Sequence, residues 1–117
     1  MSAYWVTKNV TFTCSATAVL TVSTAPSTVL SIDNIPVYTG NITVIVPSGA
    51  QQGGGTLIKP VSITLTATSM YSTSENKKIL LSTATGTGVG SFQVGESTSS
   101  MTITLSIASA GQTVVSE

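Results

Sequence analysis

Few side chains of this chain can transfer a proton, because histidine and arginine are both absent. The side-chain carboxylates belong to Asp33, Glu75, Glu96 and Glu117, which fall in separate turn or terminal regions. Acid–base catalysis needs titrating groups held together within reach of a substrate. Because these four carboxylates are far apart in turn-like sequence, we expect them to be solvated surface side chains. We therefore expect no catalytic residue among them.

Serine is abundant, but a nucleophilic serine needs a base to activate it. Without histidine the remaining arrangement is a Ser-Lys dyad, and the spacing Ser-x-x-Lys occurs at Ser74-Glu75-Asn76-Lys77. This run is a polar, turn-like stretch and not the start of a helix. This context favours a turn over a catalytic dyad. The sequence therefore predicts a protein that is not an enzyme.

Glycines cluster at 53–55 and again at Gly86, Gly88 and Gly90. A glycine-rich loop in front of a helix can hold a phosphate on its backbone N–H groups. Neither cluster precedes a helical pattern or ends in Gly-Lys-Ser/Thr, so each predicts a loop or a strand bend. Zinc and calcium need clustered Cys, His or carboxylate ligands. The single Cys14 and the dispersed carboxylates predict no metal site and no cofactor.

Four aromatic residues, Tyr4, Trp5, Tyr38 and Tyr71, are candidate interface contacts. Tyrosine and tryptophan combine a large apolar ring with a polar group, which suits both cores and binding surfaces. For Trp5, core packing, a subunit contact and a sugar platform remain open. Tyr71 lies by a predicted turn and is the better candidate for an exposed contact.

The elements that position these residues are predicted to be β-strands. From Val10 to Val22 every even position carries an apolar or small residue, and hydroxyl residues fill most odd positions. A period of two is typical of a strand with one buried face, and it returns at 61–68 and 101–108. No stretch has helical spacing. We expect strands near 4–8, 10–22, 28–32, 35–39, 42–47, 57–68, 78–84, 90–94, 101–108 and 112–115.

Length and turn residues add detail to this prediction. The 10–22 run would span about 43 Å if straight, longer than common strands, so we expect a bulge or a switch between sheets near Ser15 to Ala18. The stretch 48–56 is predicted to be the most flexible loop. At 117 residues the chain fits one domain, 1–117.

The fold class predicted from this pattern is all-β, a single antiparallel β-sandwich of immunoglobulin-like or small jelly-roll type. In strand count and composition the chain resembles immunoglobulin-like sandwich domains of viral and microbial surface proteins, although it lacks the paired cysteines of antibody domains.

Charge is the clearest compositional signal. Charged residues make up 7% of the chain and the formal net charge is +0, whereas about 25% charged residues is usual. Binding to nucleic acid or to an anionic membrane surface has little electrostatic support, and no apolar run is long enough for a membrane helix. Residues 1–9 show no signal peptide.

A monomeric β-protein protects its sheet edges and keeps a net charge, and this chain has few charges for either purpose. We therefore expect a non-enzymatic structural subunit or decoration protein of a self-assembling extracellular particle. The favoured particle is a virion, in which the chain would be a capsid, turret or tail component. Its partners would be other copies of itself or other structural proteins. The alternative is a surface module that binds carbohydrate or protein through Tyr71 and the 48–56 loop. With so few carboxylates, we also expect tolerance of acid.

Overall fold

The fold is built from antiparallel strands. The computed structural model describes residues 4–28, 30–32, 34–68 and 78–112, and within these residues it contains no helix. The all-β antiparallel prediction is confirmed, whereas a sandwich is not, because half of the strands belong to one curled sheet. The strands are β1 (Thr11–Cys14), β2 (Thr21–Val22), β3 (Ser31–Ile32), β4 (Ile35–Pro36), β5 (Ile42–Val46), β6 (Gln51–Gln52), β7 (Gly55–Leu57), β8 (Val61–Leu65), β9 (Thr85–Val94) and β10 (Ser97–Ser109).

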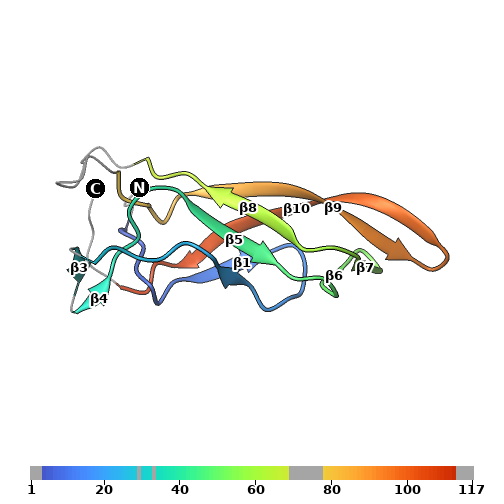
Figure 1. Cartoon of the computed structure of the whole chain (residues 1–117), viewed down its shortest axis with the longest axis horizontal. Coiled ribbons are helices and arrows are strands. Elements are labelled where there is room, and N and C mark those ends of the chain that lie inside the picture. Colours follow the sequence, from blue (N-terminus) through green and yellow to red (C-terminus); the bar gives the residue numbers. More distant parts are fainter. Residues whose placement is uncertain (1–3, 29, 33, 69–77, 113–117) are drawn as a thin grey trace.

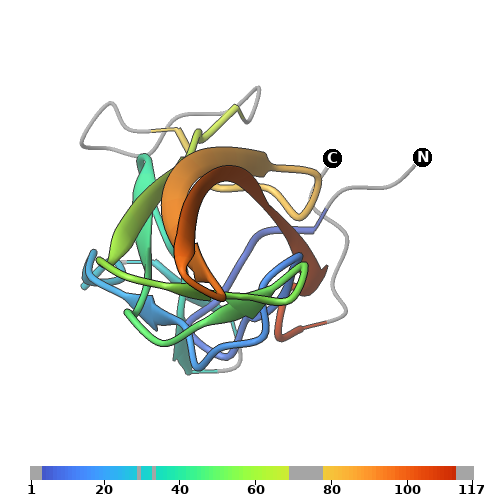
Figure 2. The same cartoon turned by 90° about the vertical axis from the view of Figure 1, so that its right-hand side faces the viewer.

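Three sheets result. A five-stranded sheet has the order β1-β10-β9-β7-β6, a three-stranded sheet has the order β2-β5-β8, and β3 pairs with β4 alone. The long β9–β10 hairpin runs along the 51 Å axis of the molecule and extends beyond the other strands at one end (Figure 1). Viewed along that axis, the hairpin curls like part of a barrel wall (Figure 2).

The curl brings together the two edges of the five-stranded sheet. Thr17, which follows β1, donates its N–H to the carbonyl oxygen of Gln51 in β6 at 2.8 Å, and the return bond measures 3.1 Å. Next to this bridge, Gln52 Nε2 donates to the carbonyl oxygen of Thr102 in β10 at 2.9 Å. The Ser15 hydroxyl donates to Gln52 Oε1 at 2.7 Å. The curled sheet is therefore closed where Thr17 and β10 meet β6.

One cluster of buried side chains fills the interior. Because the strands alternate, β5 and β8 contribute every second residue from the three-stranded sheet, and β7, β9 and β10 contribute theirs from the curled sheet. The fully buried members on these strands are Ile42, Val44, Val46, Leu57, Ile63, Leu65, Phe92, Ile103 and Leu105.

Glycines let β9 lie directly against β7 and β8. Gly86, Gly88 and Gly90 alternate along β9, and a Cβ added to any of them would lie 2.6–2.8 Å from a side-chain atom of Leu57, Val61 or Ile63. Real Cβ atoms essentially never approach so closely, so any larger residue would force its neighbours to shift. The cluster lies inside a strand and not in a loop, and the close approach of other strands explains its composition.

The run from Val10 to Val22 has the predicted alternation but is not one strand. Its even residues are buried or half-buried and its odd residues are exposed from Thr11 to Thr21. The chain bends after β1, so that β1 pairs with β10 in the curled sheet while β2 pairs with β5 in the other sheet. The predicted switch between sheets near Ser15 to Ala18 is therefore confirmed.

A hairpin replaces the flexible loop predicted at 48–56. β6 and β7 pair through Gln51–Thr56 and Gln52–Gly55. Gly53 and Gly54, between them, have positive φ angles of 56° and 79°. Positive φ at both central positions is the type I′ turn, which matches the twist of a hairpin and favours glycine. The flexible-loop prediction was wrong because this glycine run specifies a tight turn.

A triangle of backbone hydrogen bonds joins three segments at the end opposite the hairpin tip. The Val6 N–H donates to the Leu80 carbonyl, the Leu80 N–H to the Tyr38 carbonyl, and the Tyr38 N–H to the Val6 carbonyl, at 2.9–3.1 Å. All three residues are buried. The strands predicted at 4–8 and 78–84 consequently pair only through isolated bridges around this triangle.

Candidate interaction surface

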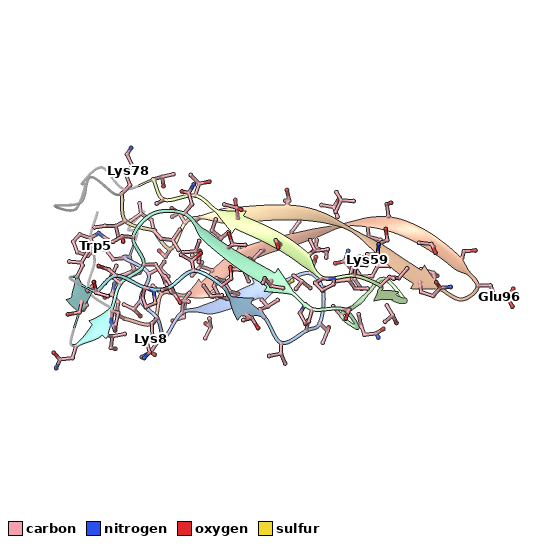
Figure 3. The ribbon with its side chains drawn as sticks, in the orientation of Figure 1. Trp5, Lys8, Lys59, Lys78 and Glu96 are labelled. Carbon is pink, nitrogen blue, oxygen red and sulfur yellow. The ribbon has the colours of Figure 1, made fainter. Side chains whose placement is uncertain are left out.

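The described charged side chains lie apart from one another. Figure 3 shows Lys8, Lys59, Lys78 and Glu96 at separate places, with Glu96 at the tip of the β9–β10 hairpin. Within the part of the chain that the structure describes, none of the four makes an ion pair, and no group of three metal-ligating side chains occurs. The other charged residues, and with them the Ser74–Lys77 run, lie outside the described residues.

Tyr4 and Trp5 are half-buried neighbours at the end that carries the backbone triangle. The Tyr4 N–H donates to Ser82 Oγ at 2.9 Å, and Gln112 Nε2 donates to the Trp5 carbonyl oxygen at 2.9 Å. The Trp5 Nε1 is buried without a hydrogen-bond partner. Tyr4 also borders a cavity of about 340 Å³ that Ser82, Ile107, Ala108, Ser109, Ala110 and Gln112 line.

Tyr38 lies in the core, where its side chain is 6% exposed. Burial raises the pKa of its hydroxyl above the ordinary value of 10.0. Its ring offers almost no surface to a partner. Tyr71 lies outside the described residues. The described aromatic candidates therefore do not gather into one exposed platform.

The outer face of the curled sheet is formed mainly by uncharged side chains. Alternation turns one side chain in two away from the core on β10, β9 and β7, and serine and threonine occupy most of these positions. We call this surface the hydroxyl face. It consists of Thr98, Ser100, Thr102 and Thr104 on β10, Thr85, Thr87, Val89, Ser91 and Gln93 on β9, and Thr56 and Ile58 at β7.

Two apolar side chains lie near the middle of the hydroxyl face. Val89 is 68% exposed and stands opposite Thr102 of β10. Ile58 is 43% exposed, and its N–H donates to the Ser91 carbonyl oxygen at 2.9 Å. This bond places Ile58 diagonal to Val89 on the same face, a separation of about 7–8 Å that side chains can bridge. The nearest charged residue in sequence is Lys59, which follows Ile58.

Sequence reasoning identified only part of this surface. The alternation at 101–108 marks the outward residues of β10, but β9 was recognised only at 90–94 because Gly86 and Gly88 conceal its buried side. The signal that would have revealed it is the alternation of Thr85, Thr87 and Val89 with those glycines.

Comparisons with protein family models, curated proteins and solved structures found no match. Among the residues that the structure describes, there is no helical segment with the length and apolarity needed to cross a bilayer.

Proposed function

We propose that this protein is a non-enzymatic structural subunit that assembles with copies of itself or with other structural proteins in an extracellular particle, with a virion as the favoured setting. The observation that supports this proposal best is the hydroxyl face, an uncharged surface with Val89 and Ile58 exposed near its centre. Soluble monomers distribute charged side chains over their surface. The centres of protein interfaces are instead depleted of charge.

Assembly through this face would bury the two apolar side chains and leave the hydroxyls to hydrogen-bond across the contact. Full burial of a Val or Ile side chain contributes about 1.5–3 kcal/mol. A pair of subunits joined by so small an apolar centre is held weakly. A subunit that contacts several neighbours at once is held much more firmly, because each further contact is effectively intramolecular.

The test is self-association measured by sedimentation velocity over a concentration series, with negative-stain electron microscopy of the concentrated sample. We expect the wild-type chain to associate and Val89→Lys to weaken association by about tenfold or more, equivalent to about 1.4 kcal/mol. Val19→Lys is the matched control, since Val19 is 84% exposed but lies between β1 and β2. A wild-type chain that stays monomeric at high concentration, with no partner, would overturn the proposal.

A second candidate is a surface module that binds a neutral carbohydrate. The cavity beside Tyr4 supports it, since an aromatic ring, two serine hydroxyls and an amide side chain border the same space. Binding of a neutral glycan that Tyr4→Ala abolishes, in a chain that remains monomeric, would favour this candidate over assembly.

For the finer fold, we propose a β-sandwich of immunoglobulin-like or small jelly-roll type.

A further inference from the structure

The outer edge of β1 is an edge of the curled sheet beside which the described residues place no further strand. At the opposite edge, β6 is covered by the bridge to Thr17. The free side of β8 in the three-stranded sheet faces β9, where the Thr64 carbonyl oxygen lies 2.8 Å from a Cβ built on Gly86. β1 pairs with β10 on one side, and on its other side the described residues provide no backbone hydrogen bond.

The pairing with β10 determines which backbone groups of β1 point outward. The Ser15 N–H donates to the Thr104 carbonyl oxygen, and Thr13 pairs with Ser106 two residues earlier. Since backbone groups alternate between the two edges of a strand, Ser15 and Thr13 face β10. The N–H and C=O groups of Phe12 and Cys14 therefore point to the open edge, where they need water or another strand as partner.

Nothing in β1 protects this edge. Exposed edges are usually blunted by a charged side chain, a proline or a bulge. β1 has the sequence Thr-Phe-Thr-Cys, with no charge and no proline. The register shift between Thr11 and Phe12 places the additional residue, Ala108, on β10, so that β1 itself stays regular.

We propose that β1 pairs antiparallel with β1 of a second copy around a two-fold axis at Thr13, joining two curled sheets into one continuous sheet. Phe12 of each copy would then exchange two hydrogen bonds with Cys14 of the other. The two Thr13 side chains would face each other in the pair between them, which carries no hydrogen bonds. This register is self-complementary, as a two-fold contact requires.

The contact rests on the proposed function, because it names a second copy as the partner and adds the edge of β1 to the hydroxyl face as a second contact between subunits. Four backbone hydrogen bonds make a weak contact by themselves. The outward side chains of β1, including Thr11 and Thr13, are uncharged and continue the hydroxyl face across the axis. Pairing would therefore double the uncharged surface that further copies can contact.

Disulfide trapping tests the register. In the full chain carrying Cys14→Ala, we expect Thr13→Cys to form a covalent dimer under mild oxidation, because opposed residues in such a pair have Cα atoms about 4.5 Å apart, within disulfide range. Thr11→Cys is the matched control, an exposed threonine on the same face of β1. In the proposed register the two residues 11 lie about 13 Å apart along the strands. We expect at least a tenfold lower yield from this control.

Hydrogen exchange of the unmodified wild-type chain provides a second measurement. The Phe12 and Cys14 amides should exchange at least tenfold faster on dilution, whereas the Thr13 amide, which faces β10, should not change. Two outcomes would overturn the β1 contact alone. One is an equal dimer yield from both cysteine variants. The other is exchange of the Phe12 and Cys14 amides that does not change on dilution although the chain associates. A chain that never associates would overturn the proposed function as well.

Discussion

At the scale of single residues, Gly88 shows how closely the strands approach. A Cβ at this position would lie 2.8 Å from Val61 Cγ1 and 3.1 Å from Ile63 Cγ1. Overpacking of this kind costs about 1–3 kcal/mol, more than the roughly 0.5–1 kcal/mol that replacing a strand glycine gains. We expect Gly88→Ala to lower the free energy of unfolding by about 1–2 kcal/mol in urea denaturation.

Two comparisons separate crowding from a general effect of substitution. Thr87→Ala changes the neighbouring residue on the exposed face of β9 and should alter stability by no more than about 0.5 kcal/mol. Val61→Ala removes the closest atom, so the double variant Gly88→Ala/Val61→Ala should lose less stability than the two single variants together. Strict additivity would show that Val61 does not limit the approach of β8 to β9.

The same residues show where sequence reasoning ends. The alternation from Val10 to Val22 predicted which side chains are buried, because burial on a strand follows the two-residue period. Gly86, Gly88 and Gly90 were predicted as a loop or bend, because glycine signals both a turn and a crowded strand. The side chains that decide between these readings, Leu57 and Val61, lie about 30 residues earlier, where local sequence gives no information.

At the scale of elements, β6 and β7 depend on tertiary pairing. These strands have two and three residues, Gln-Gln and Gly-Thr-Leu, and little intrinsic tendency to form. They exist here because Thr17 bonds to Gln51 on one side of the hairpin and β7 pairs with β9 on the other. The switch after β1 was predictable from the excessive length of the 10–22 run, whereas the partner of each half was not.

Gln52 should be the side chain that holds the closed seam of the curled sheet. Its amide nitrogen bonds to the Thr102 carbonyl and its amide oxygen accepts from Ser15, whose Oγ also accepts the Thr104 N–H at 3.0 Å. We expect Gln52→Ala to lower the free energy of unfolding by about 1–2 kcal/mol, since it removes two hydrogen bonds that water replaces only in part. Thermal denaturation measures the loss, and the Thr104 amide should exchange faster.

Gln93→Ala is the control for this prediction. The Gln93 amide bonds to the Gly95 carbonyl oxygen within an exposed turn at 2.9 Å, so its removal should cost less than about 0.5 kcal/mol. Equal losses for the two glutamine variants would contradict a special role for the seam.

At the scale of the whole molecule, apolar packing and backbone pairing hold the described residues together, and the charged side chains among them form no ion pair. The chain has four side-chain carboxylates in all, and Glu96, the one in the described ranges, makes no ion pair there. Acid denatures proteins mainly by protonating carboxylates that the folded state stabilises. We therefore expect the melting midpoint at pH 3 to lie within about 5 °C of that at pH 7, which corresponds to less than about 1 kcal/mol. A much larger drop would contradict the expected acid tolerance.

The alkaline side of the same profile should behave differently because of Tyr38. Burial raises the pKa of its hydroxyl above 10.0, so the folded state favours the neutral form. The stability that this preference contributes is fully present below pH 10 and is lost as the pH rises through the raised pKa. The melting midpoint should fall above pH 10, and Tyr38→Phe, which has no ionisable group there, should flatten that fall. A fall that stays equally steep in Tyr38→Phe would show that burial of Tyr38 is not its cause.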